Sequence, residues 1–399
     1  MQRVVVTGMG AVSACGLGAD ALWLAARDGI SGRKPVHFPE IDTQRVGHAA
    51  ALSDADKAHV AAIAGHRMRD PVAGYALIAA REAVAQAGLG PDDFGDACGV
   101  SIGSGFGGAQ TLNSNYLKFA TQGSMRLDPM SVPKIMNNAA ASWVSIEFGA
   151  TGPAYCMATA CSSASQSIGL AVQMLRAGAA SRMLAGGSEA CLEGGVFRVW
   201  ELLRVMTADL NRPFSQDRNG MMLGEGAGVL VLETLDAAQA RGAEVLCEIK
   251  GYGTNSDAGD LLRPDPDRAA ACMGLALRDA GLTAGDIAHV NTHGTGTVAN
   301  DVTEAAALRL CFGDAVPPVT ATKPVHGHAL GAAGALELIV SIGALRARLA
   351  PPTLNFSEAD PKVGLTPVHG QAMALGAGAV MSNSLAFGGI NASLIVADV

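Results

Sequence analysis

A cysteine among small side chains is the residue of this sequence best placed to act as a nucleophile. Cys161 lies in the run of residues 158–165, whose other members are alanine, serine and threonine, and an amphipathic stretch, residues 166–175, follows it. This stretch predicts a helix, so Cys161 would lie at a helix N-terminus, where unpaired N–H groups favour thiolate over thiol. Because the neighbours are small, a substrate could reach the sulfur.

A histidine follows a predicted buried strand, residues 287–292. Ligand sites of α/β sheets lie at the carboxyl ends of strands, and glycine after His293 leaves its ring free to face a cavity. Thr295 and Thr297 are two residues apart, so in extended backbone their hydroxyls point to one side. They could hydrogen-bond an amide-bearing substrate arm.

A second histidine, His328, lies five residues after Lys323 and just before a predicted helix, residues 334–349, that is rich in alanine and glycine. Those small residues predict close packing against another helix. If Lys323 and Glu337 are buried beside a histidine, they fix its protonation and orientation. His326, in contrast, is interpreted as a loop residue without a role.

One cysteine, two histidines, a lysine and a glutamate indicate a nucleophilic site with positioned donors rather than a metal site. Papain-like hydrolysis needs one histidine with an orienting asparagine or aspartate. Two histidines near one sulfur can both donate to a carbonyl, which would stabilise an enolate after an acyl group has been attached to the cysteine.

Two glycine-rich segments remain. Residues 103–108 match GxGxxG, but no clear acidic residue follows at the offset that a dinucleotide site requires, so we interpret them as a tight turn near a ligand tunnel. Phe387 precedes two glycines and could therefore swing and gate a pocket. A core phenylalanine before a hairpin explains the same pattern equally well.

The composition indicates a folded protein of 399 residues, of which 49% are hydrophobic and 16% charged. The net charge of -8 argues against nucleic-acid and anionic-membrane partners. The eight cysteines form no CxxC pair, which favours buried thiols in a reducing compartment. Because residues 1–8 read as a strand and a turn rather than a signal peptide, we expect a cytoplasmic protein.

Strands and helices alternate in both halves of the sequence, which predicts two similar mixed α/β halves although no sequence repeat is visible. Four local predictions belong to the first half. Val4–Val6 is a buried strand ended by a turn at Gly8–Gly10; Asp20 caps a helix over residues 21–28; residues 33–66 are irregular; and residues 133–148 form one helix.

The motifs resemble those of β-ketoacyl-acyl carrier protein synthases of the elongating type, over nearly the whole chain. They are TACSS at residues 159–163, HGTGT at 293–297, the Lys323–His328 spacing, and GHALGAAGALE at 327–337. The resemblance implies a thiolase-like α/β fold with a five-layered α-β-α-β-α core. Its N-terminal half, residues 1–240, would carry the nucleophile, and its C-terminal half, residues 241–399, the two catalytic histidines.

The resemblance also implies roles. Cys161 would hold an acyl chain as a thioester, and its N–H and that of Phe387 would form the oxyanion hole. His293 and His328 would promote malonyl decarboxylation and stabilise the enolate. The other implied roles are electrostatic support by Lys323 with Glu337 as its partner, phosphopantetheine binding by Thr295 and Thr297, acyl gating by Phe387, and an acyl pocket lined by Phe106.

The implied product is a 3-oxoacyl-acyl carrier protein, with no metal or other cofactor beyond the phosphopantetheine of the carrier. The implied partners are acyl carrier protein and either an identical subunit or a related chain-length subunit. Arg67, Arg69 and Arg126 could meet the acidic carrier. Leu385-Ala386 differs from the family pattern before the gate, and with Phe106 this keeps polyketide or polyene synthesis open beside fatty-acid synthesis. A non-catalytic partner subunit and a thiolase are the alternatives.

Overall fold

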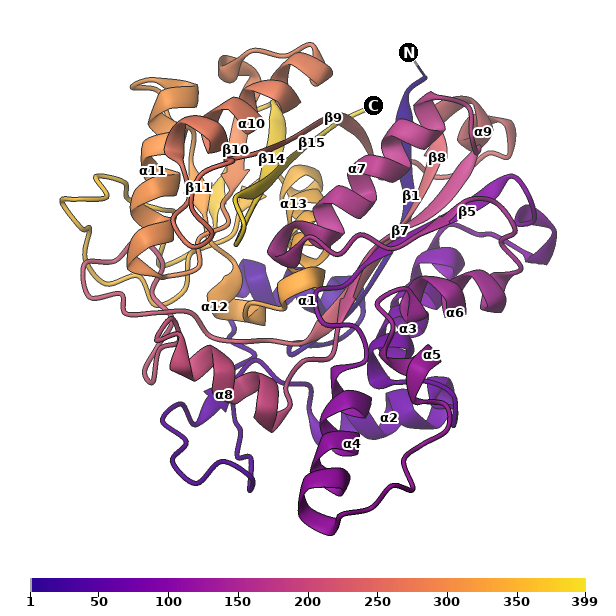
Figure 1. Ribbon diagram of the computed structural model, residues 1–399. Coiled ribbons are helices and arrows are strands. Elements are labelled where there is room, and N and C mark those ends of the chain that lie inside the picture. The colour runs from indigo at the N-terminus through magenta and orange to yellow at the C-terminus, as the bar shows by residue number, and fades with distance from the viewer. Residues whose placement is uncertain (1) are drawn as a thin grey trace.

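Two sets of strands, one from each half of the chain, form the framework of the protein (Figure 1). The computed structural model describes residues 2–399. The strands of the first half are β1 (Val4–Ser13), β5 (Cys98–Gly103), β6 (Ala154–Tyr155), β7 (Arg182–Glu189) and β8 (Gly226–Thr234). Those of the second half are β9 (Cys247–Ser256), β10 (Ile287–Asn291), β11 (Val319–Thr320), β14 (Ala379–Ala386) and β15 (Ile390–Ala397).

The strand order repeats between the halves. The first half runs β1-β8-β7-β5-β6 and the second β9-β15-β14-β10-β11. In each half the first two pairs are antiparallel and the last two are parallel. Pairing of Val5 with Glu248 and Val6 with Cys247 joins the two sets through β1 and β9. The chain is therefore an internal duplication at the level of topology.

Helices complete five layers. α7 (Ser163–Arg176) and α13 (Ala333–Ala347) lie between the two sets of strands. α3 (Pro71–Gln86) and α6 (Ala139–Phe148) cover the outer face of the first set. α10 (Pro266–Ala280) and α11 (Val298–Phe312) cover the second (Figure 1). This arrangement confirms the predicted five-layered α/β fold.

The remaining elements are short or peripheral. The helices are α1 (Ala19–Asp28), α2 (Asp54–Ala64), α4 (Ala109–Gln122), α5 (Ser131–Ile135), α8 (Gly194–Leu202), α9 (Leu235–Ala240) and α12 (Lys323–His326). The strands are β2 (Gly16–Leu17), β3 (Lys34–Pro35), β4 (His48–Ala49), β12 (Leu349–Ala350) and β13 (Met373–Ala374).

The predicted close packing of α13 is confirmed. A Cβ added to Gly334 would lie 2.1 Å from Oγ of Ser165 on α7, so the two central helices can approach only because residue 334 is glycine. The stretch Leu330–Ala347 is long and apolar enough to cross a membrane, and 89% of it is buried inside the protein. It serves here as the central core helix.

The predicted turn at Gly8–Gly10 is wrong, because β1 continues to Ser13. Both glycines lie against α3: a Cβ at Gly8 would be 2.0 Å from the carbonyl oxygen of Ala83, and one at Gly10 would be 2.1 Å from that of Ala79. They mark a close approach of strand and helix rather than a chain reversal.

Three helix predictions need correction. The residue before α1 is Gly18, not Asp20. The cap comes from another helix: the N–H of Ala19, the first residue of α1, donates to Oε1 of Glu82 on α3 at 2.8 Å. Residues 33–66 contain α2, whose N-terminal N–H groups include one bound by the hydroxyl of Ser53. Residues 133–148 are divided between α5 and α6. Helices α4 and α8 were not predicted.

Candidate active site

Cys161 lies in a one-turn 3₁₀ helix, Ala160–Ser162, that leads directly into α7, as the sequence predicted. The turn is strained, since Ala160 has a φ of 51°. Side chains hold it: the hydroxyl of Ser163 donates to the carbonyl of Ala160, and that of Ser162 donates to the carbonyl of Ile390. The cysteine is therefore presented on a rigid support.

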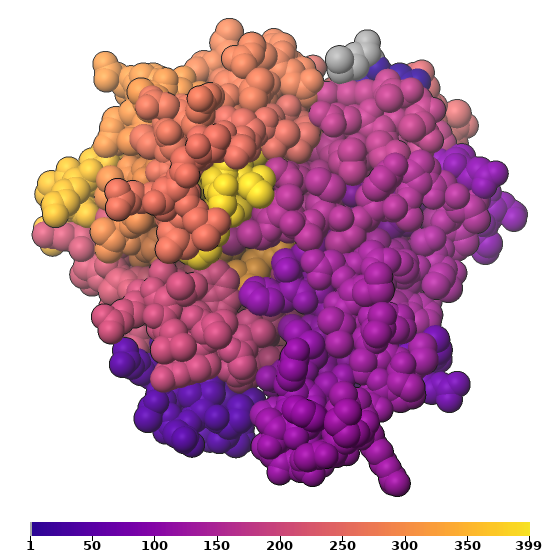
Figure 2. Space-filling model, in the orientation of Figure 1, coloured from indigo at the N-terminus to yellow at the C-terminus, as the bar shows by residue number. Residues whose placement is uncertain are grey.

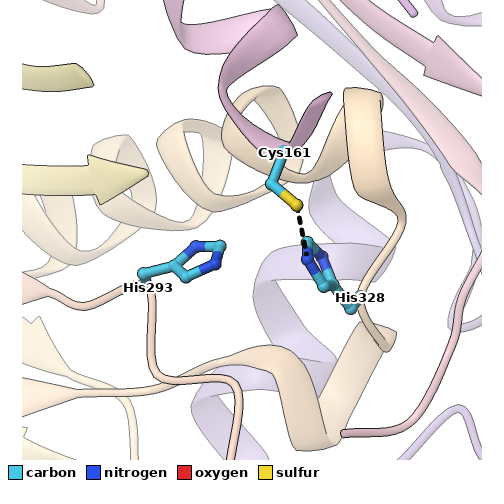
Figure 3. Close-up of side chains that lie close together, drawn as sticks. All are labelled: Cys161, His293 and His328. Atoms are coloured by element: carbon cyan, nitrogen blue, oxygen red, sulfur yellow. Dashed lines mark hydrogen bonds between the residues drawn. The ribbon is translucent and has the colours of Figure 1, made fainter. Parts of the chain in front are cut away.

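Two histidine rings flank the sulfur (Figure 3). Nε2 of His328 lies 3.1 Å from Sγ of Cys161. The ring of His293 lies across from it, with 5.3 Å between the two ring centroids and an angle of 82° between their planes. The backbone N–H of Phe387 faces the sulfur and lowers the pKa of its thiol. The structure thus brings together four residues that span positions 161 to 387.

His293 is oriented from behind by Lys323. The ammonium Nζ lies 3.2 Å from Nδ1 of His293 and also donates to the backbone carbonyl of His293 and to Oε1 of Glu337. Because an ammonium can only donate, Nδ1 of His293 is an acceptor and its proton resides on Nε2. The Lys323–Glu337 pair predicted from the sequence is therefore present, and it fixes the tautomer of His293.

A carboxylate that the sequence analysis missed holds the turn after β10. Glu304 of α11 accepts the N–H groups of His293 at 2.7 Å and Gly294 at 2.8 Å. Gly294 has a φ of 41°, a conformation that favours glycine. Glu304 lies 11 residues after His293 in the sequence and belongs to none of the motifs quoted above. Only its burial in the structure distinguishes it from a surface glutamate.

Burial determines the protonation states of the site. It raises the pKa of the Cys161 thiol to about 11, although Lys323 and the N–H of Phe387 lower it. Burial and then the charge of Lys323 hold the pKa values of His293 and His328 well below their usual range. Burial thus opposes the thiolate expected from the helix start and favours a thiol between two neutral imidazoles in the free protein.

The sulfur and both rings face a cavity of about 310 Å³. Thr295 and Thr297 line it, with their hydroxyl oxygens 2.9 Å apart, as expected from their spacing. Arg204 and Arg263 lie on its lining, both exposed. Exposed apolar side chains lie beside them at the mouth: Leu203, Leu261, Leu262 and Val298.

Comparison with known proteins now identifies the family. The model "Beta-ketoacyl synthase, N-terminal domain" matches residues 1–238, and "Beta-ketoacyl synthase, C-terminal domain" matches residues 246–357. The chain belongs to the β-ketoacyl synthase family. As a β-ketoacyl synthase it is an acyltransferase that condenses acyl units, which confirms the resemblance seen in the motifs.

Relatives of this β-ketoacyl synthase cover almost its whole length. Nodulation protein E of Rhizobium sp. (strain N33) is 39% identical over 98% of both chains. A 3-oxoacyl-[acyl-carrier-protein] synthase 2 of Staphylococcus aureus (strain N315) is 36% identical over 99% of this chain and 98% of its own. The solved structure titled "The ishigamide ketosynthase/chain length factor" has a TM-score of 0.95 at 34% identity, with 100% of this chain and 99% of that chain covered.

The gate predicted in this β-ketoacyl synthase lies in the turn between β14 and β15. The ring of Phe387 stacks on the buried indole of Trp200, with centroids 5.9 Å apart and planes at 17°. The N–H of Gly388 donates to the carbonyl of Leu261, at 2.8 Å. The turn is thus held on one side by α8 and on the other by the loop at the cavity mouth.

Phe106 is not among the residues that line the cavity beside Cys161. Its side chain is 40% exposed on the turn after β5, and its N–H donates to Glu189. Its role in an acyl pocket stays a prediction. The run of residues 103–108 is indeed a tight turn, as the sequence analysis preferred over a nucleotide site.

The three ligand-type atoms of Cys161, His293 and His328 lie within 4.8 Å of one another. Cysteine and histidine also make up zinc sites, so the charges around these three residues decide whether they suit a metal ion. The ammonium of Lys323 against His293 opposes a dication at this position, because a second positive charge would be placed beside a buried cation. The neighbouring charge fits acyl chemistry better than a metal centre.

Proposed function

We propose that this β-ketoacyl synthase transfers an acyl chain to Cys161 and condenses it, with loss of carbon dioxide, with a malonyl unit on acyl carrier protein. The product is a 3-oxoacyl-acyl carrier protein. The observation that carries the proposal is the placement of the Cys161 sulfur 3.1 Å from Nε2 of His328, with the ring of His293 on the other side of the same cavity.

In the first half-reaction the sulfur of Cys161 attacks the thioester carbon of the incoming acyl carrier. Nε2 of His328 takes the thiol proton as the new C–S bond forms and returns it to the departing carrier thiolate as the old C–S bond breaks. The N–H groups of Cys161 and Phe387 stabilise the oxyanion. Within residues 2–399, Nδ1 of His328 has no hydrogen-bond partner, so this ring can hold its proton on either nitrogen.

In the second half-reaction a malonyl thioester occupies the cavity. The Nε2–H of His293, whose tautomer Lys323 fixes, donates to the thioester carbonyl, and His328 supplies the second donor. Loss of carbon dioxide leaves the electron pair in an enolate, whose carbon attacks the acyl thioester on Cys161. The C–S bond breaks, and the released thiolate takes up a proton to restore the thiol.

The substrate arm would lie along the two threonines. Thr295 and Thr297 present adjacent hydroxyls to the cavity, which suits the amides of phosphopantetheine. No cofactor is needed beyond that arm of the carrier. Arg204 and Arg263 at the mouth suit an acidic carrier, whereas Arg69 is already stacked on Trp143 at 4.1 Å.

We further propose that the protein works as a dimer in the cytoplasm. β6 is a short exposed edge strand, and apolar side chains of α4 and the loop after it are exposed, which favours a covering subunit. These side chains are Leu112, Tyr116, Phe119, Met125 and Leu127. The segment that carries them lies at the lower edge of the molecule in Figure 2. The related structure "The ishigamide ketosynthase/chain length factor" supports the proposal that the partner is an identical or a chain-length subunit. The eight free thiols suit a reducing compartment.

A non-catalytic chain-length subunit is the alternative. It predicts the loss of a reacting side chain, whereas Cys161, His293, His328 and Lys323 are all present and mutually hydrogen-bonded or adjacent. Fatty-acid and polyketide or polyene synthesis both use the proposed chemistry, and the acyl chain that is accepted distinguishes them.

The test is a condensation assay with malonyl carrier protein and a panel of acyl carriers of varied length and unsaturation. Formation of 3-oxoacyl products that is lost in Cys161→Ala supports the proposal. Cys161→Gln should abolish condensation and keep or raise malonyl decarboxylation. Full condensation by Cys161→Ala would overturn the mechanism.

A further inference from the structure

Glu189 is a buried carboxylate that the mechanism above does not use. It ends β7 and is fully buried. Within residues 2–399 no lysine, arginine or histidine forms an ion pair with it. Its ligands are instead neutral donors from two separate turns, so its place in the fold calls for an explanation other than charge pairing.

The first turn is the glycine run after β5. The N–H of Gly105 lies 2.8 Å from Oε2 of Glu189, and that of Phe106 lies 3.0 Å from Oε1. The hydroxyl of Ser104 approaches Oε1 at 3.3 Å. The backbone position of Phe106, the residue predicted to line an acyl pocket, is therefore set by this carboxylate.

The second turn follows His328. The N–H of Gly331 lies 2.9 Å from Oε2 of Glu189. Gly331 belongs to the 3₁₀ helix Leu330–Ala332, in which Leu330 is strained at a φ of 43°. This turn corresponds by topology to the one that carries Cys161 in the first half.

Positions 105 and 331 have to be glycine, because the two turns lie too close to each other and to the carboxylate of Glu189 for a Cβ atom. A Cβ on Gly331 would lie 2.3 Å from the nitrogen of Gly105 and 2.7 Å from Oε2 of Glu189. A Cβ on Gly105 would lie 2.9 Å from the same oxygen. The two turns therefore meet at Glu189 without room for a methyl group.

We propose that Glu189 is a positioning residue that ties the turn of Phe106 to the turn after His328. Displacement of the Phe106 turn, by an acyl chain or a neighbouring subunit, is thereby transmitted to the strained turn that carries the imidazole beside Cys161. The proposal rests on the proposed function only in taking Cys161 and His328 as the reacting pair.

Glu189→Gln tests the tie. An amide offers one acceptor oxygen where the carboxylate offers two, so the turn of Phe106 loses at least one bond whichever way the amide faces. When the amide oxygen takes the place of Oε1, the bond to Gly331 is lost as well. We expect kcat for condensation to fall on the order of 10- to 100-fold, with KM for the carrier little changed, because Glu189 does not line the cavity. The order of preference among acyl chain lengths should also change.

Alkylation of Cys161, followed by mass spectrometry, provides a second readout, and the Gly331→Ala variant described below shows how much a loss of packing alone would change it. Burial raises the pKa of the Cys161 thiol most, and the charge of Glu189 raises it further. Burial also raises the pKa of Glu189 itself to about 7, so its carboxylate is charged at pH 8. Its removal should therefore make alkylation at pH 8 faster while condensation becomes slower. This measurement needs no ketosynthase activity, so it separates failure of this proposal from failure of the proposed function.

Two further variants complete the test. Gly331→Ala should lower kcat without the increase in alkylation, because it separates the turns and leaves the charge. Glu225→Gln is the matched control: Glu225 is a buried carboxylate of the same half, bound by Lys57, Tyr75 and the N–H of Leu52, with no bond to either of the two turns. The proposal is overturned if Glu189→Gln folds and keeps kcat and chain preference, or if Glu225→Gln lowers kcat equally.

Discussion

The ammonium of Lys323 lies 3.2 Å from Nδ1 of His293, and both side chains are buried. This contact, backed by Glu337, fixes which nitrogen of His293 faces the cavity. Replacement of Lys323 alone would leave the Glu337 carboxylate buried without a partner, a loss of about 3–5 kcal/mol of stability. A useful variant must therefore remove both charges.

The double variant Lys323→Met/Glu337→Gln should fold, because neither charge is left alone. We expect malonyl decarboxylation to fall on the order of 10- to 100-fold, since His293 loses its fixed tautomer and orientation. Release of carbon dioxide from malonyl carrier protein measures this step alone. An unchanged rate would remove Lys323 from the account.

The reactivity of Cys161 should rise steadily with pH. Burial raises the pKa of its thiol to about 11, so the thiolate fraction increases about tenfold per pH unit below that value. The rate of alkylation by iodoacetamide, measured from pH 7 to pH 9.5, should follow this slope without levelling. A plateau beginning near pH 7 would show a thiolate already formed in the free enzyme.

The elements that carry chemistry were the easiest to predict from the sequence. Cys161 lies in a motif whose small residues leave room for a substrate to reach the sulfur. His328 lies in a motif whose small residues allow close packing of the helix that follows. Lys323 and Glu337 were paired correctly because a buried lysine requires a partner. Contacts within one motif or between adjacent elements can be inferred from the chain itself.

The sequence did not predict the carboxylates that hold the site and its helices from distant parts of the chain. Glu304, Glu189 and Glu82 each accept backbone N–H groups of another element, and no local pattern marks them as different from surface acids. The glycines at positions 8 and 10 were assigned to a turn. They are in fact needed for contact with α3, which lies about 70 residues away in the chain and is not visible in the local sequence. Tertiary contact, not local propensity, decides such residues.

Phe106 should limit the acyl chain. Phe106→Ala removes the ring and should raise use of longer acyl carriers relative to shorter ones by about tenfold. Phe119→Ala, which also removes an exposed ring in the same region but is not predicted to line the pocket, is the control. Equal chain preference in both variants and in the unmodified enzyme would refute the pocket assignment.

Arg204 and Arg263 should attract the carrier to the cavity mouth. In the double variant Arg204→Ala/Arg263→Ala we expect KM for acyl carrier protein to rise about fivefold, as exposed charges contribute about 1 kcal/mol together, with kcat unchanged. Raising the salt concentration should reduce the difference. Arg278→Ala, at an exposed position on α10, should leave KM unchanged. A rise in KM as large in this control would refute the docking role.

The central claim is that Cys161 carries the acyl chain. The most direct measurement is mass spectrometry of the intact enzyme after incubation with an acyl carrier in the absence of malonyl carrier, followed by peptide mapping. The account predicts a mass increase of one acyl group, located on Cys161, absent from Cys161→Ala and discharged when malonyl carrier is added. Condensation without any acyl adduct on Cys161, or an adduct on another residue that malonyl carrier discharges, would contradict it.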